Sequence, residues 1–316
     1  MKVVVAGANG LIGKELVRAL VERGDEVTAL VRRKQELAGA KAVLWDGRGD
    51  GPWTAAIEGA DAVVNLAGAN VADHRWSDEF KREILESRTH STRAIVEAIR
   101  AAKGKPRVLV NASAVGYYGG RGDDPVDESA PVGTDFLAGV VKAWEEEARR
   151  ADVRTVLLRT GIVLARDGGA LAKMIPPFKA FVGGPIGNGR QWMPWIHLAD
   201  EVSAILWALD HQELKGPVNL TAPNPVTMGD FAKTLGKVLH RPSWAKVPAA
   251  ALKVALGEFA TVLVEGQRVV PLELQRSKFT FRFTELPAAL QDLLGHRASR
   301  AAAPSKVPPV SSTSTS

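Results

Sequence analysis

Near its amino terminus the sequence carries a glycine-rich turn between an apolar run and an amphipathic segment. Residues 2–6 are mostly β-branched and apolar, which is typical of a buried parallel strand. In residues 14–23 the apolar side chains recur at helical spacing. Three glycines lie between these segments, Gly7, Gly10 and Gly13. This order of strand, glycine turn and helix predicts the first crossover of a dinucleotide-binding fold.

Each glycine has a separate role in such a turn. Gly7 permits the tight turn, Gly10 lets the backbone approach a pyrophosphate, and Gly13 lets helix and strand pack closely. The free N–H groups and the positive dipole end of the helix then face the phosphates, and Leu11 and Ile12 are assigned to the cofactor site with the glycines. The alternative is a glycine-rich turn that holds no ligand.

A basic segment follows the second predicted strand, residues 26–31. It consists of Arg32, Arg33 and Lys34, and the nearest carboxylate, Glu36, lies beyond it. In this fold an acidic residue at such a position binds the ribose 2′-hydroxyl of NAD, whereas arginine accommodates the 2′-phosphate of NADP. The sequence therefore predicts NADP(H) as the cofactor, with a solvated basic loop as the alternative.

Further predicted strands and helices alternate along the chain. They are strands at residues 42–45, 62–67, 107–111 and 154–159, and helices within 75–103 and at 136–150. This alternation predicts an α/β fold with a Rossmann-type doubly wound parallel sheet. We expect an NADP-binding domain over residues 1–165, to which later segments return. A smaller C-terminal α/β substrate lobe is expected over 166–295, and a disordered tail over 296–316.

Composition narrows the range of functions. The 316 residues are 46% hydrophobic and 24% charged, as in an ordinary soluble globule. No apolar run is long enough to span a membrane, no signal peptide is visible, and the chain has no cysteine. We therefore expect a cytoplasmic protein without membrane contact or thiol chemistry.

Neither the net charge nor the spacing of the histidines indicates a nucleic-acid partner or a metal ion. The net charge is +6, of which the tail supplies half, so we expect no nucleic-acid partner. Six histidines are scattered without metal-ligand spacing, so no metal site is predicted. The oligomeric state stays open.

The glycine spacing resembles the opening of extended or atypical short-chain dehydrogenases/reductases. Asn65–Gly68, at the end of the fourth predicted strand, is similar to a cofactor-lining segment of these enzymes. The resemblance implies cofactor contacts at Leu66, Ala67 and Gly68, and we also assign Val163 to that site. It further implies that two helical residues, Glu83 and Arg88, face the cofactor, although they also fit an ordinary surface charge pair.

The usual catalytic tyrosine of these enzymes is absent. In their Tyr-x-x-x-Lys unit the tyrosine transfers a proton, while a lysine tunes it and a serine polarises the substrate. Here Lys142 stands in the corresponding helix, but four residues earlier is Ala138, which cannot move a proton. The only tyrosines are Tyr117 and Tyr118, in a predicted loop at residues 112–131.

Two interpretations of this site remain open. In the first, Tyr117 or Tyr118 is a relocated acid beside Ser113, which keeps the serine position, and Lys142. In the second, the site binds cofactor but does no such chemistry. As alternatives to a functional role, Ser113 is an ordinary turn residue and Lys142 is a solvated surface side chain.

Joint motifs extend the resemblance over residues 1–295. They are Asn65–Gly68, Phe136–Leu137 with Trp144–Glu145, Gly183–Gly187 with Pro194–His197, and Leu263–Pro271. Together they are similar to the YfcH-like epimerase family proteins, atypical short-chain dehydrogenases with a C-terminal domain of unknown function. The resemblance implies NADP(H) binding and no active-site tyrosine. The substrate of the family is not established, so the word "epimerase" in its name reflects the fold and not a known reaction.

The glycine-rich segment 183–197 is predicted to border the substrate cleft. Arg190 suits an anionic group, and Trp192 and Trp195 suit an apolar wall for a sugar or aromatic ring. A packed connection between lobes is the alternative, and His197 is expected to be structural. We thus expect a small-molecule substrate, anionic or sugar-like.

The function stays open between two classes of protein. One is an NADP(H)-dependent oxidoreductase or nucleotide-sugar epimerase-like enzyme, favoured by the retained Ser113. The other is a non-catalytic NADP(H) sensor that regulates a partner, favoured by the missing tyrosine.

Overall fold

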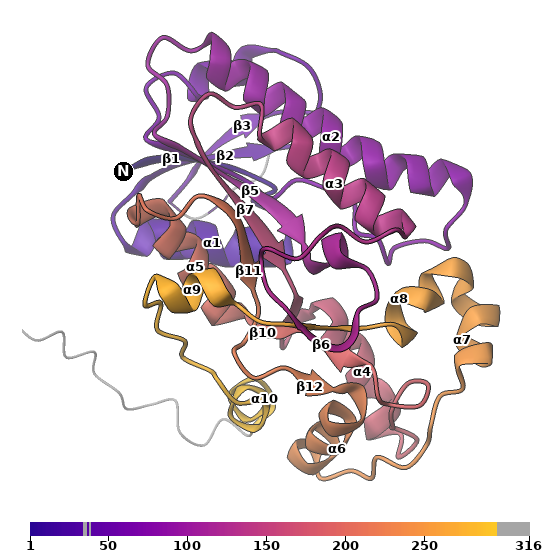
Figure 1. The fold of residues 1–316 in the computed structure, drawn as a ribbon. Coiled ribbons are helices and arrows are strands. Elements are labelled where there is room, and N and C mark those ends of the chain that lie inside the picture. The colour runs from indigo at the N-terminus through magenta and orange to yellow at the C-terminus, as the bar shows by residue number, and fades with distance from the viewer. Residues whose placement is uncertain (34–36, 38, 296–316) are drawn as a thin grey trace, which may run out of the picture.

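A parallel sheet forms the larger lobe of the protein (Figure 1). The computed structural model describes residues 1–33, 37 and 39–295. The sheet strands are β1 (Lys2–Ala6), β2 (Glu26–Val31), β3 (Lys41–Leu44), β4 (Ala62–Asn65), β5 (Val108–Ala114), β7 (Arg154–Thr160) and β11 (Gly216–Leu220). Their order is β11-β7-β5-β4-β1-β2-β3, and every neighbouring pair is parallel. This confirms the predicted doubly wound sheet.

Helices cover both faces of this sheet. The four that do so are α1 (Leu11–Glu22), α2 (Asp78–Ala101), α3 (Phe136–Ala148) and α5 (Leu198–Asp210). Helices α1 and α5 pack on one face, and α2 and α3 lie together on the other (Figure 1). Alternation along β1 divides its side chains, because Val3 and Val5 join the α1–α5 core while Val4 joins the opposite core. Helix α5 and strand β11 belong to this lobe although they follow the first elements of the smaller lobe in the sequence.

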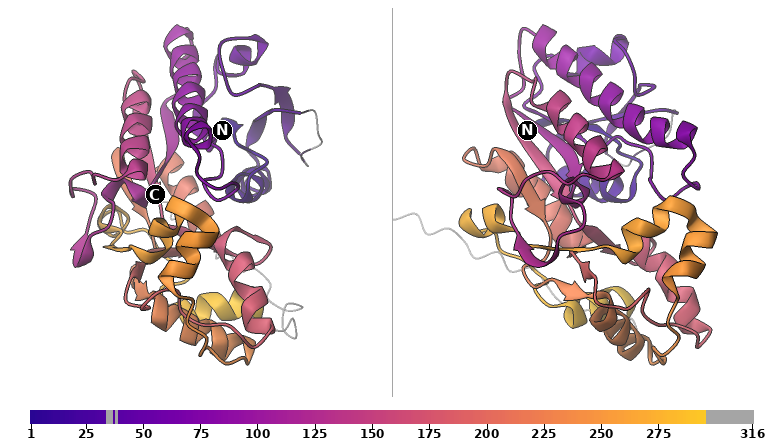
Figure 2. Two further views of the ribbon diagram at one scale, coloured as in Figure 1. Left: turned by 90° about the vertical axis from the view of Figure 1, so that its right-hand side faces the viewer. Right: turned by 45° about the vertical axis from the view of Figure 1, so that its right-hand side comes forward.

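A smaller lobe continues from the carboxyl end of β7 (Figure 2). Its helices are α4 (Gly169–Lys179), α6 (Met228–Leu239) and α10 (Leu286–Leu294). Its short strands are β8 (Ile162–Ala165) with β10 (Trp195–His197), and β9 (Trp192–Met193) with β12 (Val226–Thr227). A separate hydrophobic core of Phe178, Trp195, Phe231 and their neighbours holds these elements together. The lobe therefore has its own core.

Two strands far apart in the sequence join the lobes. They are β6 (Gly122–Val126) and β13 (Gln267–Val269), which pair in parallel. The expectation of a plain loop over residues 112–131 is wrong: the segment holds the end of β5, the 3₁₀ turn η2 (Val115–Tyr118) and β6. Strand β6 was missed because Gly122–Val126 consists mostly of residues that are rare in strands, Gly, Asp and Pro, and it becomes a strand by pairing with β13.

The remaining elements lie mostly in the C-terminal part. They are η1 (Pro52–Ala56), α7 (Ala249–Leu256), η3 (Gly257–Phe259), α8 (Ala260–Val264) and α9 (Leu272–Arg276). The α7–α8 segment reaches back toward the start of α2, where Trp76 packs on Phe259 and Lys81 pairs with Glu258. None of the helices described is both long and apolar enough to cross a membrane. The predicted tail, 296–316, lies outside the described residues.

Candidate functional site

The glycine turn between β1 and α1 is packed too closely for side chains. Gly7 has φ +75°, and a Cβ there would lie 2.6 Å from the Leu66 carbonyl carbon. A Cβ on Gly13 would lie 2.2 Å from the carbonyl oxygen of Gly7. Real Cβ atoms do not approach so closely, so the turn and the end of β4 require glycine at both positions.

The start of α1 is open to a ligand. Gly10 is the N-cap residue, it is exposed, and no side chain caps the helix. The first turn contains no acidic residue, and Lys14 donates the first helical bond, to the Gly10 carbonyl. The N–H groups of Leu11 and Ile12 are therefore left for a ligand, and the positive end of the helix dipole favours an anion. We call the glycine turn and the start of α1, residues 7–13, the cofactor cradle. It fits the pyrophosphate of a dinucleotide.

Buried hydrogen bonds of Asn65 fix the segment that follows β4, Leu66–Gly68. Asn65 is fully buried, and its amide donates to Asn111 Oδ1 at 2.7 Å. Its side-chain oxygen Oδ1 accepts from the Ala67 N–H at 3.1 Å. This holds Leu66–Gly68 against the glycine turn, as the predicted cofactor lining requires.

Arg88 is the cation nearest to this segment. A Cβ on Gly68 would lie 3.3 Å from Arg88 Cγ, and the guanidinium stacks 5.1 Å from the centre of the Trp144 ring. Burial lowers the pKa of Arg88 to about 10. Its guanidinium donates to the Ile84 carbonyl, and no carboxylate of the described chain pairs with it. Glu83 is exposed on the same helix and does not form the surface pair considered for it.

The other predicted cofactor residues lie in different surroundings. Arg32 and Arg33 follow β2 directly and are exposed, and Lys34 lies outside the described residues. Val163 is half-buried in β8, where its backbone pairs with Ile196.

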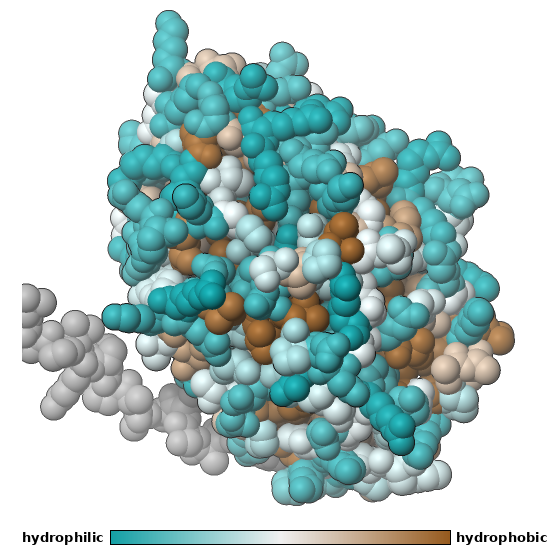
Figure 3. Space-filling view, viewed as in Figure 1, coloured by the Kyte–Doolittle hydropathy of each residue, from teal (hydrophilic) through white to brown (hydrophobic). Residues whose placement is uncertain are grey.

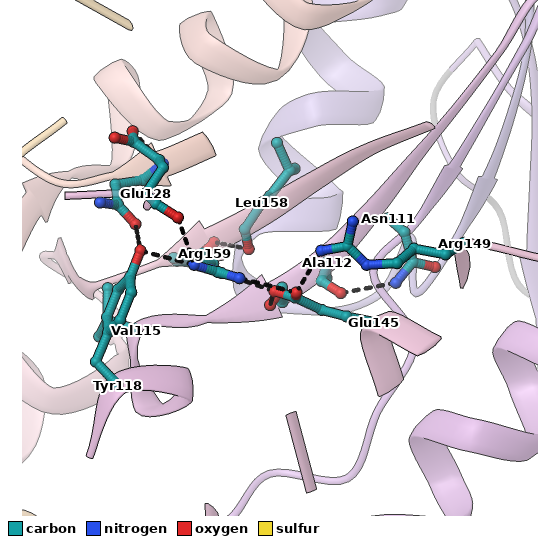
Figure 4. Close-up of polar contacts among 12 residues, drawn as sticks. Asn111, Ala112, Val115, Tyr118, Glu128, Glu145, Arg149, Leu158 and Arg159 are labelled. Carbon is teal, nitrogen blue, oxygen red and sulfur yellow. Dashed lines mark hydrogen bonds and ion pairs between the residues drawn. The ribbon is translucent and has the colours of Figure 1, made fainter. Parts of the chain in front are cut away.

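A buried polar cluster occupies the carboxyl ends of β5 and β7 (Figure 4). The guanidinium of Arg159 grips the Glu145 carboxylate twice, with N–O distances of 2.8 and 3.0 Å. The Ser113 hydroxyl donates to Glu145 Oε1 at 2.7 Å, and Arg149 donates to Oε2 at 3.0 Å. Because Glu145 accepts all these bonds, Ser113 is held as a donor to the carboxylate.

Tyr118 belongs to the same cluster and is locked within it (Figure 4). Its hydroxyl accepts from Arg159 at 2.9 Å and donates to Asn219 Oδ1 at 2.6 Å. Burial raises the pKa of Tyr118 to about 12, against the opposing effect of Arg159. Burial also disfavours the charge on Arg159, but the Glu145 carboxylate outweighs it and raises the pKa of Arg159.

Tyr117 is the more accessible of the two tyrosines. It is half-buried, and the Arg159 guanidinium carbon lies 3.5 Å from the centre of its ring. The two tyrosine rings meet edge to face at 5.5 Å. Within the described chain the Tyr117 hydroxyl makes no hydrogen bond. Its hydroxyl is therefore free to meet a ligand.

Lys142 does not join this cluster, contrary to the expectation. Its side chain is 57% exposed and lies 3.8 Å from Glu146, on the outer face of α3. Ala138, four residues earlier, is fully buried. Although residues four apart share a helix face, the Lys142 side chain extends to solvent, so Lys142 is not a member of the cluster.

The three predicted substrate residues lie in three different environments. Trp195 is fully buried in the core of the smaller lobe, so it cannot line a cleft, and that prediction is wrong. Trp192 is half-buried, donates to Asp123 Oδ1 at 2.8 Å and stacks under Arg268. Arg190 is exposed, without an ion pair to a described carboxylate.

His197 has the structural role expected of it. It is the N-cap residue of α5, and its Nδ1 accepts from the Ala199 N–H at 3.0 Å. Its ring stacks on Phe283 at 4.0 Å, and burial lowers its pKa to about 4. The histidine is therefore neutral and tied to the helix start.

Sequence reasoning missed the two residues that organise the cluster, Glu145 and Arg159. Glu145 follows Trp144 on the inner face of α3, and Arg159 follows an apolar run in β7. Charged residues in such positions are buried only when paired, which is the signal that could have found them.

Two family models match the chain. The NAD dependent epimerase/dehydratase family matches residues 3–220, and a domain of unknown function, DUF1731, matches residues 247–293. The first match covers the sheet lobe and the second covers the segment from α7 to α10.

Named relatives match over nearly the whole chain. An Arabidopsis thaliana protein called "Epimerase family protein SDR39U1 homolog, chloroplastic" is 44% identical, over 93% of this chain and 87% of its own. "Epimerase family protein YfhF" of Bacillus subtilis is 38% identical, over 94% of this chain and 99% of its own.

Solved structures show the same fold. Human epimerase family protein SDR39U1, crystallised with NADPH, is 35% identical with a TM-score of 0.87, over 93% of this chain and 99% of its own. A UDP-glucuronic acid 4-epimerase from Bacillus cereus has a TM-score of 0.76 over 93% of this chain and 98% of its own. At 16% identity, that second likeness concerns the fold alone.

Proposed function

The chain belongs to the NAD dependent epimerase/dehydratase family, and from that premise we propose that it is an NADP(H)-dependent oxidoreductase or epimerase-like enzyme. The observation that carries the proposal is the buried cluster of Ser113, Glu145 and Arg159 under Tyr117, at the strand ends that adjoin the cofactor cradle. Ligands of doubly wound folds bind at such strand ends. The substrate is a small polar molecule, anionic or sugar-like.

The choice of NADP(H) rests on two cations. Arg32 and Arg33 are exposed after β2, where a 2′-phosphate would lie in this fold, and neither pairs with a carboxylate of the described chain. The similar human protein was crystallised with NADPH, which supports the same choice.

Arg88 supports a second anionic contact. A guanidinium that is buried without a carboxylate is unfavourable until an anion reaches it. Its place beside Gly68, near the glycine turn, suits the cofactor phosphates. We propose that Arg88 and the N–H groups of Leu11 and Ile12 hold the pyrophosphate together.

The bound nicotinamide supplies or accepts a hydride. For the accompanying proton we assign Tyr117 rather than Tyr118, because the Tyr118 hydroxyl already has a donor and an acceptor. Arg159 places a fixed positive charge 3.5 Å from the centre of the Tyr117 ring, and we propose that it takes over the electrostatic role of the missing lysine. The Ser113 hydroxyl donates a hydrogen bond to Glu145, so its oxygen is oriented to accept a hydrogen bond from a substrate hydroxyl.

A non-catalytic NADP(H) sensor is the second candidate. It is favoured by a specific observation: the Ser113 hydroxyl is engaged by Glu145 and is not available as a donor to a substrate carbonyl. Such a protein would bind NADPH and signal its presence to a partner.

Turnover of NADPH separates the two candidates. Purified protein is incubated with NADPH and panels of carbonyl compounds, hydroxy compounds and nucleotide sugars, and consumption of cofactor or substrate is followed. We expect turnover that is lost in Tyr117→Phe and Ser113→Ala but largely retained in Tyr118→Phe and in Lys142→Ala, the exposed control. Tight NADPH binding by calorimetry without turnover on any panel would support the sensor instead.

A further inference from the structure

Cations are unevenly distributed in the smaller lobe. Residues 168–199 and 231–257 contain no Asp or Glu at all, although the whole chain has 41 basic and 35 acidic residues. The basic residues of these two segments are Lys173, Lys179, Arg190, Lys233, Lys237, Arg241, Lys246 and Lys253. None of them forms an ion pair with a carboxylate in the part of the chain that the structure describes. The modest net charge of the chain conceals this local excess.

The two segments meet at the end of α4. The Trp244 indole N–H donates to the Phe181 carbonyl at 3.1 Å, and the Arg241 guanidinium lies 4.6 Å from the centre of the Phe181 ring. Backbone bonds join them further, since Ala245 donates to the Gly183 carbonyl. Figure 1 shows the coil between α6 and α7, which carries Trp244, along the lower edge of this lobe.

We call this surface the basic aromatic patch. It consists of Phe181, Val182 and Trp244 with the neighbouring cations Lys179, Lys237, Arg241 and Lys246. Lys179 and Phe181 end the α4 segment, whereas Lys237 is on α6 and the other members are on the coil after it. The patch thus joins three stretches of chain into one surface.

The apolar members of the patch are unusually exposed. Phe181, Val182 and Trp244 have exposed fractions of 55%, 51% and 69%. Because the Trp244 N–H is satisfied by the protein, the indole surface that remains is apolar. Phe181 also has φ +63°, a strained conformation for a bulky residue, and no burial of its ring compensates for that strain.

We propose that the basic aromatic patch docks on the surface of an anionic lipid bilayer. Cations without acidic neighbours are attracted to anionic headgroups, and protruding tryptophan and phenylalanine rings partition into the interface between headgroups and acyl chains. An acidic protein or a nucleic acid would use the cations, but neither calls for a cluster of protruding apolar side chains that includes Val182. Peripheral docking of this kind needs no spanning helix.

Helix α7 extends the apolar surface next to the patch. None of its residues is buried, and Val254 is 78% exposed beside Lys253. In the region of α7 and α8, at the right of Figure 3, brown and beige apolar residues lie among hydrophilic ones. The repeated combination of an exposed apolar side chain and an adjacent lysine is what interfacial attachment requires.

Vesicle sedimentation with the full chain tests the proposal. The probes are phosphatidylcholine vesicles with and without about one third phosphatidylserine, at low and high salt. We expect binding to the anionic vesicles only, with release at high salt. The double variant K179E/K246E should weaken this binding at least about tenfold, because two attractive charges become repulsive.

Two further variants isolate the contributions. Trp244→Ser tests the apolar part, and binding to anionic vesicles should fall several-fold with its salt dependence retained. The charge-reversed control K103E/K215E changes two exposed lysines outside the patch and should bind within about twofold of the unmodified protein, because these lysines lie away from the attached surface. Circular dichroism and thermal unfolding establish that each variant is folded.

Three results would overturn the proposal. The first is equal sedimentation with neutral and anionic vesicles, or none with either. The second is an equal loss of binding in K179E/K246E and in the control double variant. The third is retention of the protein on nucleic acid or on an acidic polypeptide with no binding to anionic vesicles, which would assign the patch to another macromolecule.

Discussion

The cofactor cradle and the buried polar cluster lie at the same edge of the sheet but are built in opposite ways. In the cradle, the first N–H groups of α1 and the guanidinium of Arg88 have no anionic partner within the described residues. In the cluster, Arg159 binds both Glu145 and Tyr118, and Glu145 and Tyr118 make further bonds to Ser113, Arg149 and Asn219. The comparison teaches that the cradle needs a ligand to balance its charge, whereas the cluster is balanced without one.

This difference restricts which side chains can take part in the proposed reaction. A side chain that is fully paired in the interior cannot change its charge without losing those bonds. For the proposed reaction, we therefore assign the reacting roles to Tyr117, which is half-buried, and to the oxygen of Ser113. The cluster supports them by fixing Arg159 and Glu145.

Breaking the cluster from inside has the largest expected effect. Glu145→Ala leaves Arg159 charged and buried without a partner, which should lower the free energy of unfolding by about 3–5 kcal/mol. Urea unfolding measures it, with Glu146→Ala, the exposed neighbour on α3, as the matched control that should change it by less than about 0.5 kcal/mol. Similar losses in the two variants would contradict the internal balance of the cluster.

A buried carboxyl without a cation sharpens the comparison. Glu201 is fully buried; it accepts from the Thr160 hydroxyl at 2.8 Å, and its second oxygen has no partner in the described chain. Burial raises the pKa of Glu201 to about 8, above its usual 4.5. The folded state then holds a proton that the unfolded state releases, so stability is lost as the pH rises from about 4.5 to about 8.

Glu201→Gln keeps the bond from Thr160 and cannot ionise. We expect it to stabilise the protein by about 3 kcal/mol near pH 7, with little effect below pH 4.5. Unfolding followed at several pH values measures the difference between the two proteins. A constant difference at every pH would show that ionisation of Glu201 is not involved.

The cradle is tested by reversing a charge at its far end. Arg32→Asp should weaken NADP(H) binding by about 1–3 kcal/mol and NAD(H) binding much less, because only the former has a 2′-phosphate. Calorimetry with both cofactors measures the two losses. Equal losses would refute the assignment of NADP(H), and binding of neither cofactor by the unmodified protein would remove the proposed function altogether.

The smallest effect is expected at Lys142. The Lys142 side chain is exposed, and its one ion pair in the described chain, with Glu146 at 3.8 Å, is on the surface. Lys142→Ala should therefore change the free energy of unfolding by less than about 0.5 kcal/mol. Turnover and NADPH affinity should stay within about twofold of the unmodified protein, since the position is outside the cluster. A large loss of turnover with normal cofactor affinity would restore Lys142 to the site.

Local patterns predicted the sheet lobe well. The glycine turn, the alternating strands and helices and the helix 78–101 all follow from short-range periodicity, which the fold preserves. Strand β6 could not be predicted this way, because its residues are polar and its only strand partner, β13, is distant in the sequence. Trp195 was misassigned for a related reason, since a glycine-rich neighbourhood does not reveal which tryptophan faces the core.

By itself, the sequence determined the cofactor turn and the absence of the usual tyrosine, because both depend on residues within one turn or one helix. The close packing of Gly13 on Gly7 and the alanine at position 138 are consequences of local spacing. The tertiary structure alone decided that Glu145 and Arg159 meet beneath Tyr117, because α3 and β7 come together only when the sheet is assembled. Side-chain pairing across elements depends on that assembly, and no spacing along the chain encodes it.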